Sequence, residues 1–267
     1  RPLFCFPPAG GGSASYFRNL ARALPGTLVE VSAVQLPGRE DRRGEPLLTS
    51  IEELAEEYAE ALRAIQPEGD IVPYALFGHS MGGLLAFEVA RRLERRQDGG
   101  EEVSGLILSD AYAPYTTERR EASHLLGDDE TGNALEEAES VSQALLAELR
   151  RLGGTKPPEL LEDEELLSLA LPALRADYRA LETYRAVPIE APSVRATLFY
   201  GADDPLATLD GLLAADRTKA YGEVGEDRWR EYTPGAFDVR MLPGDHFYLL
   251  EDHVELEEVL EHILRAL

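Results

Sequence analysis

A serine between glycines marks the segment where this chain could carry out nucleophilic chemistry. Gly78, Ser80 and Gly82 match the pattern G-x-S-x-G, between an apolar run and a segment with helical periodicity. In that context the serine occupies a sharp turn from a strand into a helix, and a Cβ at either glycine would collide with the neighbouring strand and helix. The turn exposes the hydroxyl at a helix N-terminus, where backbone N–H groups favour negative charge. We predict that Ser80 is a nucleophile.

A serine nucleophile needs a base that removes its proton, and histidine is the usual one. Of the five histidines, His246 follows an expected strand and precedes a helix-like segment. That position lies at the strand edge where Ser80 is expected, so we predict that His246 is the base. The alternative is that His246 caps a helix or lies on the surface. The other histidines are expected in the turn, with the ring pointing away from the serine hydroxyl (His79), in a polar loop (His124) and on the surface in or beside the last helix (His253 and His262).

The base in turn needs a carboxylate that orients it, and three aspartates follow expected strands. The G-x-x-D spacing that begins at Gly201 points to Asp204. Its neighbour Asp203 is expected to brace the loop. Asp110 directly follows the strand expected over Val103–Ser109, and some enzymes place the acid there, one strand earlier. We predict that Asp204 is the acid, with Asp110 and then Asp203 as alternatives.

Negative charge that develops on a carbonyl oxygen needs two N–H donors. Met81, the residue after the serine, is expected to supply one. The loop FPPAGGGS at residues 6–13 follows the first expected strand, and its glycines let backbone approach a substrate. We predict that Ala9 supplies the second N–H, with Gly10 as the alternative. A phosphate-binding loop is disfavoured, because the following Lys-Ser/Thr pair and the G-x-G-x-x-G spacing are missing.

Composition excludes several classes of partner. With 26 basic and 50 acidic residues the net charge is −24, so nucleic acid is not expected as a partner. No apolar run approaches the roughly 18 residues that suggest a membrane span, and no signal peptide is expected. Cys5 is the single cysteine and is expected to be buried without a disulfide. We therefore expect a cytoplasmic monomer that needs no metal or organic cofactor.

Short apolar segments alternate with helical ones, which predicts an α/β protein with a mostly parallel, doubly wound sheet. Residues 1–110 and 188–267 are expected to form this core. Residues 111–187 are expected to form a helical insertion, which either adds bulk or covers the strand ends as a lid. The expected strands are Leu3–Phe6, Leu28–Val34, Tyr74–Phe77, Val103–Ser109, Val194–Tyr200 and Phe237–Leu242. The expected helices are Ser50–Ile65, Gly82–Gln97, Ser140–Leu152, Glu162–Leu171, Pro172–Tyr184 and Val254–Leu267, with a polar loop over Thr116–Gly132.

Together these segments resemble the type II thioesterases of polyketide and nonribosomal peptide biosynthesis, in order and along nearly the whole chain. The resemblance implies an α/β-hydrolase fold whose helical insertion shapes an acyl chamber. It implies a stand-alone enzyme that removes aberrant or stalled acyl groups from the phosphopantetheine thiol of acyl or peptidyl carrier proteins. It also implies Ser80 as nucleophile, His246 as base and the Asp203–Asp204 pair as the source of the acid. The matching segments are Phe4–Leu20, Val34–Arg43, Tyr74–Leu93, Leu149–Leu161, Leu171–Tyr184, Phe199–Pro205 and Leu242–Leu250.

Two features depart from the family pattern and keep alternatives open. Asp110 stands where a non-acidic residue is expected, and it resembles the acid position of thioesterase domains that end a synthase. The segment Leu209–Asp227 is longer than usual and is expected to add a surface loop. The alternatives are a product-releasing domain of a synthase, a general esterase, and a non-catalytic carrier-binding protein. The presence of both Ser80 and His246 argues against the last of these.

An acidic carrier protein would need local positive charge on this acidic chain. Two arginine clusters could supply it, although an ordinary solvated charged face is the more common explanation for each cluster taken separately. The clusters are Arg39, Arg42 and Arg43, and then Arg91, Arg92, Arg95 and Arg96 on the helix after the serine.

Overall fold

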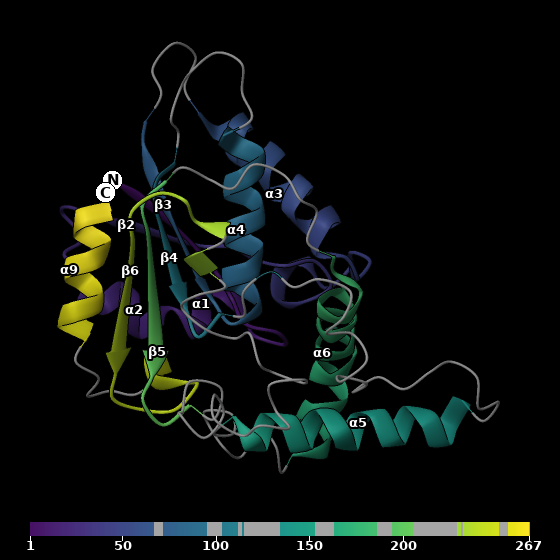
Figure 1. Cartoon of the computed structure of the whole chain (residues 1–267). Coiled ribbons are helices and arrows are strands. Elements are labelled where there is room, and N and C mark those ends of the chain that lie inside the picture. Colours follow the sequence, from purple (N-terminus) through teal and green to yellow (C-terminus); the bar gives the residue numbers. More distant parts are fainter. Residues whose placement is uncertain are drawn as a thin grey trace.

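A single sheet of parallel strands organises the molecule. The computed structural model describes residues 1–66, 72–94, 103–111, 114, 134–152, 163–185, 194–204, 229–230, 232–250 and 256–266. Within these residues six strands pair in the order β2-β1-β3-β4-β5-β6, and every pair is parallel (Figure 1). The expected parallel α/β sheet is therefore confirmed. The strands are β1 (Pro2–Phe6), β2 (Glu30–Ala33), β3 (Tyr74–His79), β4 (Val103–Ser109), β5 (Ala196–Gly201) and β6 (Phe237–Leu242).

Helices cover both faces of this sheet. The described helices are α1 (Ser13–Tyr16), α2 (Arg18–Ala23), η1 (Glu40–Arg42), α3 (Ile51–Ile65), α4 (Met81–Glu94), α5 (Ala134–Arg151), α6 (Glu164–Thr183), η4 (Tyr248–Leu250) and α9 (Leu256–Ala266). Helices α3 and α4 lie on one face, and α2 and α9 lie on the other (Figure 1). Along β3, Tyr74 and Leu76 enter the apolar core of the first face, whereas Ala75 and Phe77 enter that of the second. The strand is apolar without a break because both of its faces are buried.

The two edge strands are less buried than the central ones. β2 and β6 are largely half-buried, because each has a neighbour on one side only. The short helices α1 and α2 have no counterpart in the sequence prediction, since segments of four and six residues show little periodicity. Helix α3 begins where predicted, and the Ser50 hydroxyl accepts a hydrogen bond from the Glu53 N–H as its N-cap. The side chain of Cys5 is buried, as expected.

The chain between β4 and β5 contributes α5 and α6, which lie near the carboxyl ends of the strands (Figure 1). The prediction of two helices that meet at Pro172 was wrong, because α6 runs through Pro172 without a break. A proline costs about 3 kcal/mol inside a helix. The buried face that α6 presents through Leu174, Asp177 and Ala180 offsets this cost.

Several predicted features lie outside the described residues. They are the loops Thr116–Gly132 and Leu209–Asp227, and the side chains of Arg95, Arg96, His124 and His253. Across the described part of the chain, no helix has the length and apolar character needed to span a membrane.

Candidate active site

The turn between β3 and α4 holds Ser80 in a strained conformation. Its φ is +54°, a region that costs a residue with a side chain about 1–2 kcal/mol. The Ser80 N–H donates to the Ser109 carbonyl at 2.8 Å, which fixes the turn against β4. A Cβ on Gly78 would lie 2.1 Å from the Gly82 carbonyl oxygen, and one on Gly82 would lie 2.1 Å from that of Phe6. The predicted collisions at both glycines are confirmed, and only glycine permits this close approach.

The carboxyl ends of β5 and β6 bring Asp204 and His246 into direct contact. His246 Nδ1 lies 2.7 Å from Asp204 Oδ2, and both side chains are almost fully buried. An ionised carboxylate only accepts hydrogen bonds, so Nδ1 is the protonated nitrogen and Nε2 is left with a free lone pair. Since parallel strands end at one edge, Ser80 after β3 lies on the same edge as this pair. The arrangement can orient an imidazole to receive a proton.

The other two aspartates occupy different positions. Asp203 is exposed, and its N–H donates to the Gly244 carbonyl at 2.8 Å, which fits the expected bracing of the loop. Asp110 is buried with φ +42°, and its Oδ1 accepts the Gly201 N–H at 3.0 Å. Burial, and then the neighbouring Asp204 carboxylate, raise the pKa of Asp110 well above its ordinary value. Asp110 therefore holds its proton more tightly than an ordinary aspartic acid.

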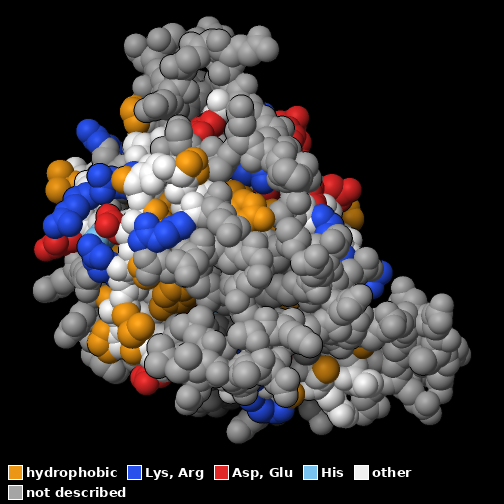
Figure 2. All heavy atoms as spheres, in the orientation of Figure 1, with side chains coloured by type: hydrophobic (Ala, Val, Ile, Leu, Met, Phe, Trp, Pro, Cys, Tyr) orange, Lys and Arg blue, Asp and Glu red, His pale blue; other side chains and the backbone are white. Residues whose placement is uncertain are grey.

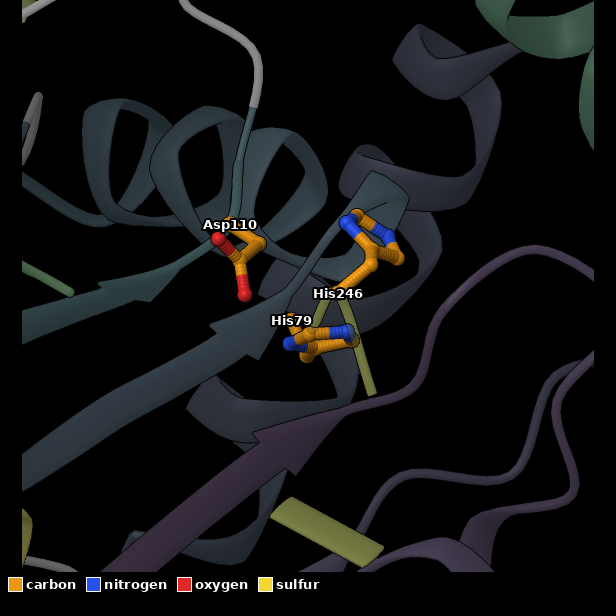
Figure 3. Close-up of side chains that lie close together, drawn as sticks. All are labelled: His79, Asp110 and His246. Atoms are coloured by element: carbon orange, nitrogen blue, oxygen red, sulfur yellow. The ribbon is translucent and has the colours of Figure 1, made fainter. Parts of the chain in front are cut away.

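A second buried polar group, His79, lies beneath His246. The ring centroids of the two histidines are 5.0 Å apart, and Figure 3 shows the His79 ring below Asp110 and His246, with the three side chains close together. His79 Nδ1 lies 2.8 Å from Ser109 Oγ, which lies 2.6 Å from the Tyr248 hydroxyl. Burial lowers the pKa of His79 well below its ordinary value, so the ring is neutral. Sequence reasoning missed Ser109 and Tyr248. Ser109 could have been found as a hydroxyl residue at the end of an apolar strand, and Tyr248 as a hydroxyl residue two positions after His246.

The donor atoms of His79, Asp110 and His246 fall within 4.8 Å of one another, so a metal ion is a geometric possibility (Figure 3). A metal needs a deprotonated carboxylate, whereas the pKa of Asp110 is raised. On the two histidines only Nδ1 is engaged, that of His246 with Asp204 and that of His79 with Ser109. His79 Nε2 and Asp110 Oδ2 have no hydrogen-bond partner among the described residues. The raised pKa of Asp110 is thus the observation that disfavours a metal in this cluster.

The two donors predicted in the loop after β1 differ in whether their N–H groups are already engaged. The Gly10 N–H donates to Asp177 Oδ2 at 2.7 Å, and the Gly11 N–H donates to the Pro8 carbonyl at 3.0 Å. For the Ala9 N–H, no acceptor occurs among the described residues. Of the two predicted donors in this loop, Gly10 is thus occupied and Ala9 remains available. Met81 begins α4, where the first N–H groups have no partner within the helix.

An apolar cavity of about 190 Å³ adjoins this loop. It lies between the loop, helices α5 and α6, and the segment after His246 that includes Phe247. The cavity can hold several methylene groups of an acyl chain. Its main apolar lining residues are Leu146, Leu149, Leu167, Ala170, Leu171 and Leu174 from the helices, with Tyr16, Phe247 and Leu250.

The predicted arginine clusters are mostly engaged in internal ion pairs. On the face in Figure 2, the described arginines lie among acidic and hydrophobic side chains. Arg43 is exposed, and no acidic partner for it occurs in the part of the chain that the structure describes. The engaged pairs are Arg39 with Asp177, Arg42 with Glu45 and Glu57, Arg91 with Glu88, and Arg92 with Glu56 and Glu88.

Comparison with known proteins places this chain among thioesterases. The thioesterase domain model matches residues 1–267. A probable cadicidin biosynthesis thioesterase of Streptomyces griseus is 39% identical over 265 residues, which span 99% of this chain and 62% of that relative. The thioesterase PikA5 of Streptomyces venezuelae is 41% identical over 263 residues, which span 98% of this chain and 80% of that relative.

Solved structures agree with the sequence comparisons. The thioesterase RedJ of the prodiginine pathway in Streptomyces coelicolor superimposes with a TM-score of 0.74 at 36% identity, over 100% of this chain and 90% of RedJ. The type II thioesterase BorB of the borrelidin cluster gives a TM-score of 0.71 at 37% identity, over 99% of this chain and 91% of BorB.

The raised pKa of Asp110 predicts how pH affects stability. Below about pH 3.9, Asp110 is protonated in both the folded and the unfolded chain. As the pH rises toward the folded-state pKa, only the unfolded chain releases the proton, so wild type loses up to about 1.4 kcal/mol per pH unit. We expect Asp110→Asn to gain free energy of unfolding relative to wild type between pH 5 and pH 7, measured by urea titration. If the difference in unfolding free energy between Asp110→Asn and wild type stays constant or shrinks as the pH rises, the pKa of Asp110 is not raised in the folded chain.

Proposed function

Because this chain belongs to the thioesterase domain family, we propose that it hydrolyses acyl thioesters through a covalent intermediate on Ser80. We infer that its substrates are aberrant or stalled acyl groups on the phosphopantetheine arm of acyl or peptidyl carrier proteins. The observation that carries the proposal is the buried 2.7 Å contact of His246 with Asp204 at the strand edge where the Ser80 turn lies. The relatives named for cadicidin and prodiginine biosynthesis, and a type II thioesterase of the yersiniabactin NRPS/PKS pathway, support the substrate class.

The proposed mechanism follows from the protonation states of the site. His246 Nε2 removes the Ser80 proton as Oγ attacks the thioester carbonyl carbon. The N–H groups of Met81 and Ala9 donate to the oxyanion, and Asp204 stabilises the imidazolium. The C–S bond breaks and His246 returns the proton to the leaving thiolate. Water then loses a proton to His246, attacks the acyl-serine, and releases the free acid and the Ser80 hydroxyl.

The alternative of a product-releasing synthase domain drew its support from Asp110. In the structure the carboxylate that contacts His246 belongs to Asp204, and the pKa of Asp110 is raised well above its ordinary value. This arrangement favours the editing enzyme. The internal ion pairs weaken the hypothesis that a carrier protein docks on the two arginine clusters. Four of these arginines are already paired with acidic residues of this chain: Arg39, Arg42, Arg91 and Arg92.

Release of butyric acid from a carrier protein tests the proposal most broadly. We expect kcat/KM for the carrier thioester to exceed that for butyryl coenzyme A and for p-nitrophenyl butyrate by about tenfold or more, which corresponds to about 1.4 kcal/mol. Ser80→Ala should abolish release, and Asp204→Asn should lower kcat by about 10⁴-fold. Asp110→Asn is the matched control and should lose less than about tenfold, because an amide of the same shape replaces a carboxyl group whose pKa is raised.

Three results would contradict parts of this account. A preference for the oxygen ester would indicate a general esterase. A larger loss for Asp110→Asn than for Asp204→Asn would move the acid to β4. Normal turnover by Ser80→Ala would show that the site is elsewhere.

The cavity predicts how chain length affects turnover. Ala170 lines it from α6, so Ala170→Phe should fill part of the space. We expect kcat/KM for an octanoyl N-acetylcysteamine thioester to fall about tenfold or more, while that for the acetyl thioester changes less than about twofold. Leu169→Phe is the matched control, because Leu169 is exposed on the same helix and does not line the cavity. Equal losses for both chain lengths would show that acyl chains do not enter the cavity.

A further inference from the structure

A buried ion pair joins α6 to the segment after β2, where Arg39 precedes η1. Asp177 on α6 is 1% exposed, and the Arg39 side chain is 10% exposed. Arg39 Nη1 donates to Asp177 Oδ2 at 2.6 Å, and Nη2 donates to Oδ1 at 2.8 Å. The pairing is bidentate, which fixes the orientation of the carboxylate as well as its position.

The same carboxylate holds the backbone of the loop after β1. Asp177 Oδ2 accepts the Gly10 N–H at 2.7 Å, one residue after Ala9. Gly10 has φ +69°, and a Cβ there would lie 2.7 Å from Leu174 Cδ1, one helical turn before Asp177. Helix α6 therefore contacts the loop through a hydrogen bond and through close packing at the same point.

The segment that carries Arg39 also fixes the far end of the loop. Glu40 Oε2 accepts hydrogen bonds from the Ser13 hydroxyl at 2.9 Å and from the Ser13 N–H at 3.3 Å. Glu40 takes φ +48°, a conformation that a residue with a side chain adopts rarely. Two adjacent residues thus anchor the loop at two points. Arg39 acts through Asp177, which holds Gly10, and Glu40 holds Ser13 directly.

Electrostatics explains why the carboxylate is paired. A lone negative charge next to the Ala9 N–H would repel an oxyanion that forms there. Arg39 neutralises Asp177 while it leaves one oxygen able to accept from Gly10. The pair can therefore hold the loop without opposing negative charge in the site.

We propose that Asp177 and Arg39 are positioning residues that set the Ala9 N–H for the oxyanion. The inference rests on the proposed function, because it assumes the Ser80 chemistry. It makes the geometry of the oxyanion site depend on the position of α6, a helix of the segment between β4 and β5. Neither residue touches the reacting atoms in this account, and both act through the backbone of the loop.

Hydrolysis of S-butyryl-N-acetylcysteamine and inhibition by butylboronic acid test the proposal together. The boronate forms a tetrahedral adduct with the serine hydroxyl and so reports on the oxyanion site. We expect Asp177→Asn to lower kcat about tenfold to a hundredfold and to raise the boronate Ki by a similar factor, with KM within about threefold. Arg39→Gln should lower kcat more than Asp177→Asn does, because it leaves the Asp177 carboxylate without its arginine partner. The double variant should regain activity relative to Arg39→Gln.

A matched control separates positioning from stability. Glu88 on α4 is buried, pairs with Arg91 at 2.8 Å and accepts a hydrogen bond from Tyr184 just after α6. Glu88→Gln should lower Tm and leave the boronate Ki within about twofold. If Asp177→Asn fails to fold, Arg39→Lys keeps the charge but removes the bidentate fork, and it should still raise the boronate Ki.

The outcomes distinguish this inference from the function on which it rests. An inactive Ser80→Ala together with wild-type kcat and boronate Ki in folded Asp177→Asn or Arg39→Lys would overturn the positioning role alone. If the double variant has a kcat as low as that of Arg39→Gln, the claim that Arg39 is needed to neutralise the Asp177 charge is wrong. Full activity in Ser80→Ala would overturn the proposed function itself.

Discussion

The close approach of backbone at the turn after β3 is the constraint on which the rest of the site depends. Gly82 contacts the Phe6 carbonyl of β1, and Gly78 contacts the carbonyl of Gly82 itself, so no side chain fits at either position. This contact holds Ser80 at φ +54° and begins α4 directly after it. It also brings the end of β1, and therefore the loop that carries Ala9, against the start of α4. One packing contact thus positions Ser80, the proposed nucleophile, and both proposed oxyanion donors.

Burial gives two neighbouring carboxyl groups different roles. Asp204 contacts His246, whereas Asp110 has a raised pKa and accepts the Gly201 N–H on one oxygen. Two adjacent buried carboxylates cannot both ionise without strong repulsion, so one retains its proton. Asp110, with its raised pKa, can then support the loop after β5 without competing for the imidazole.

The sequence alone predicts the structural elements that have a strong local signal. The G-x-S-x-G turn, the capped helix after Ser50 and the apolar central strands all follow from short-range patterns. It was insufficient where tertiary packing overrides a local rule, as in α6, which continues through Pro172 because its buried face holds it. The contact of Asp177 with Gly10 joins residues 167 positions apart, and no spacing rule predicts such a pair. The choice between Asp110 and Asp204 likewise needed the distance to His246.

Rapid-quench mass spectrometry of the enzyme with a butyryl carrier protein tests the central claim most directly. The acyl-serine account predicts that, within the first turnover, the peptide containing Ser80 gains the mass of a butyryl group in place of a proton. The adduct should disappear as free butyric acid accumulates. Release of butyric acid with no acylated peptide, or with the acyl group on a different residue, would contradict the account.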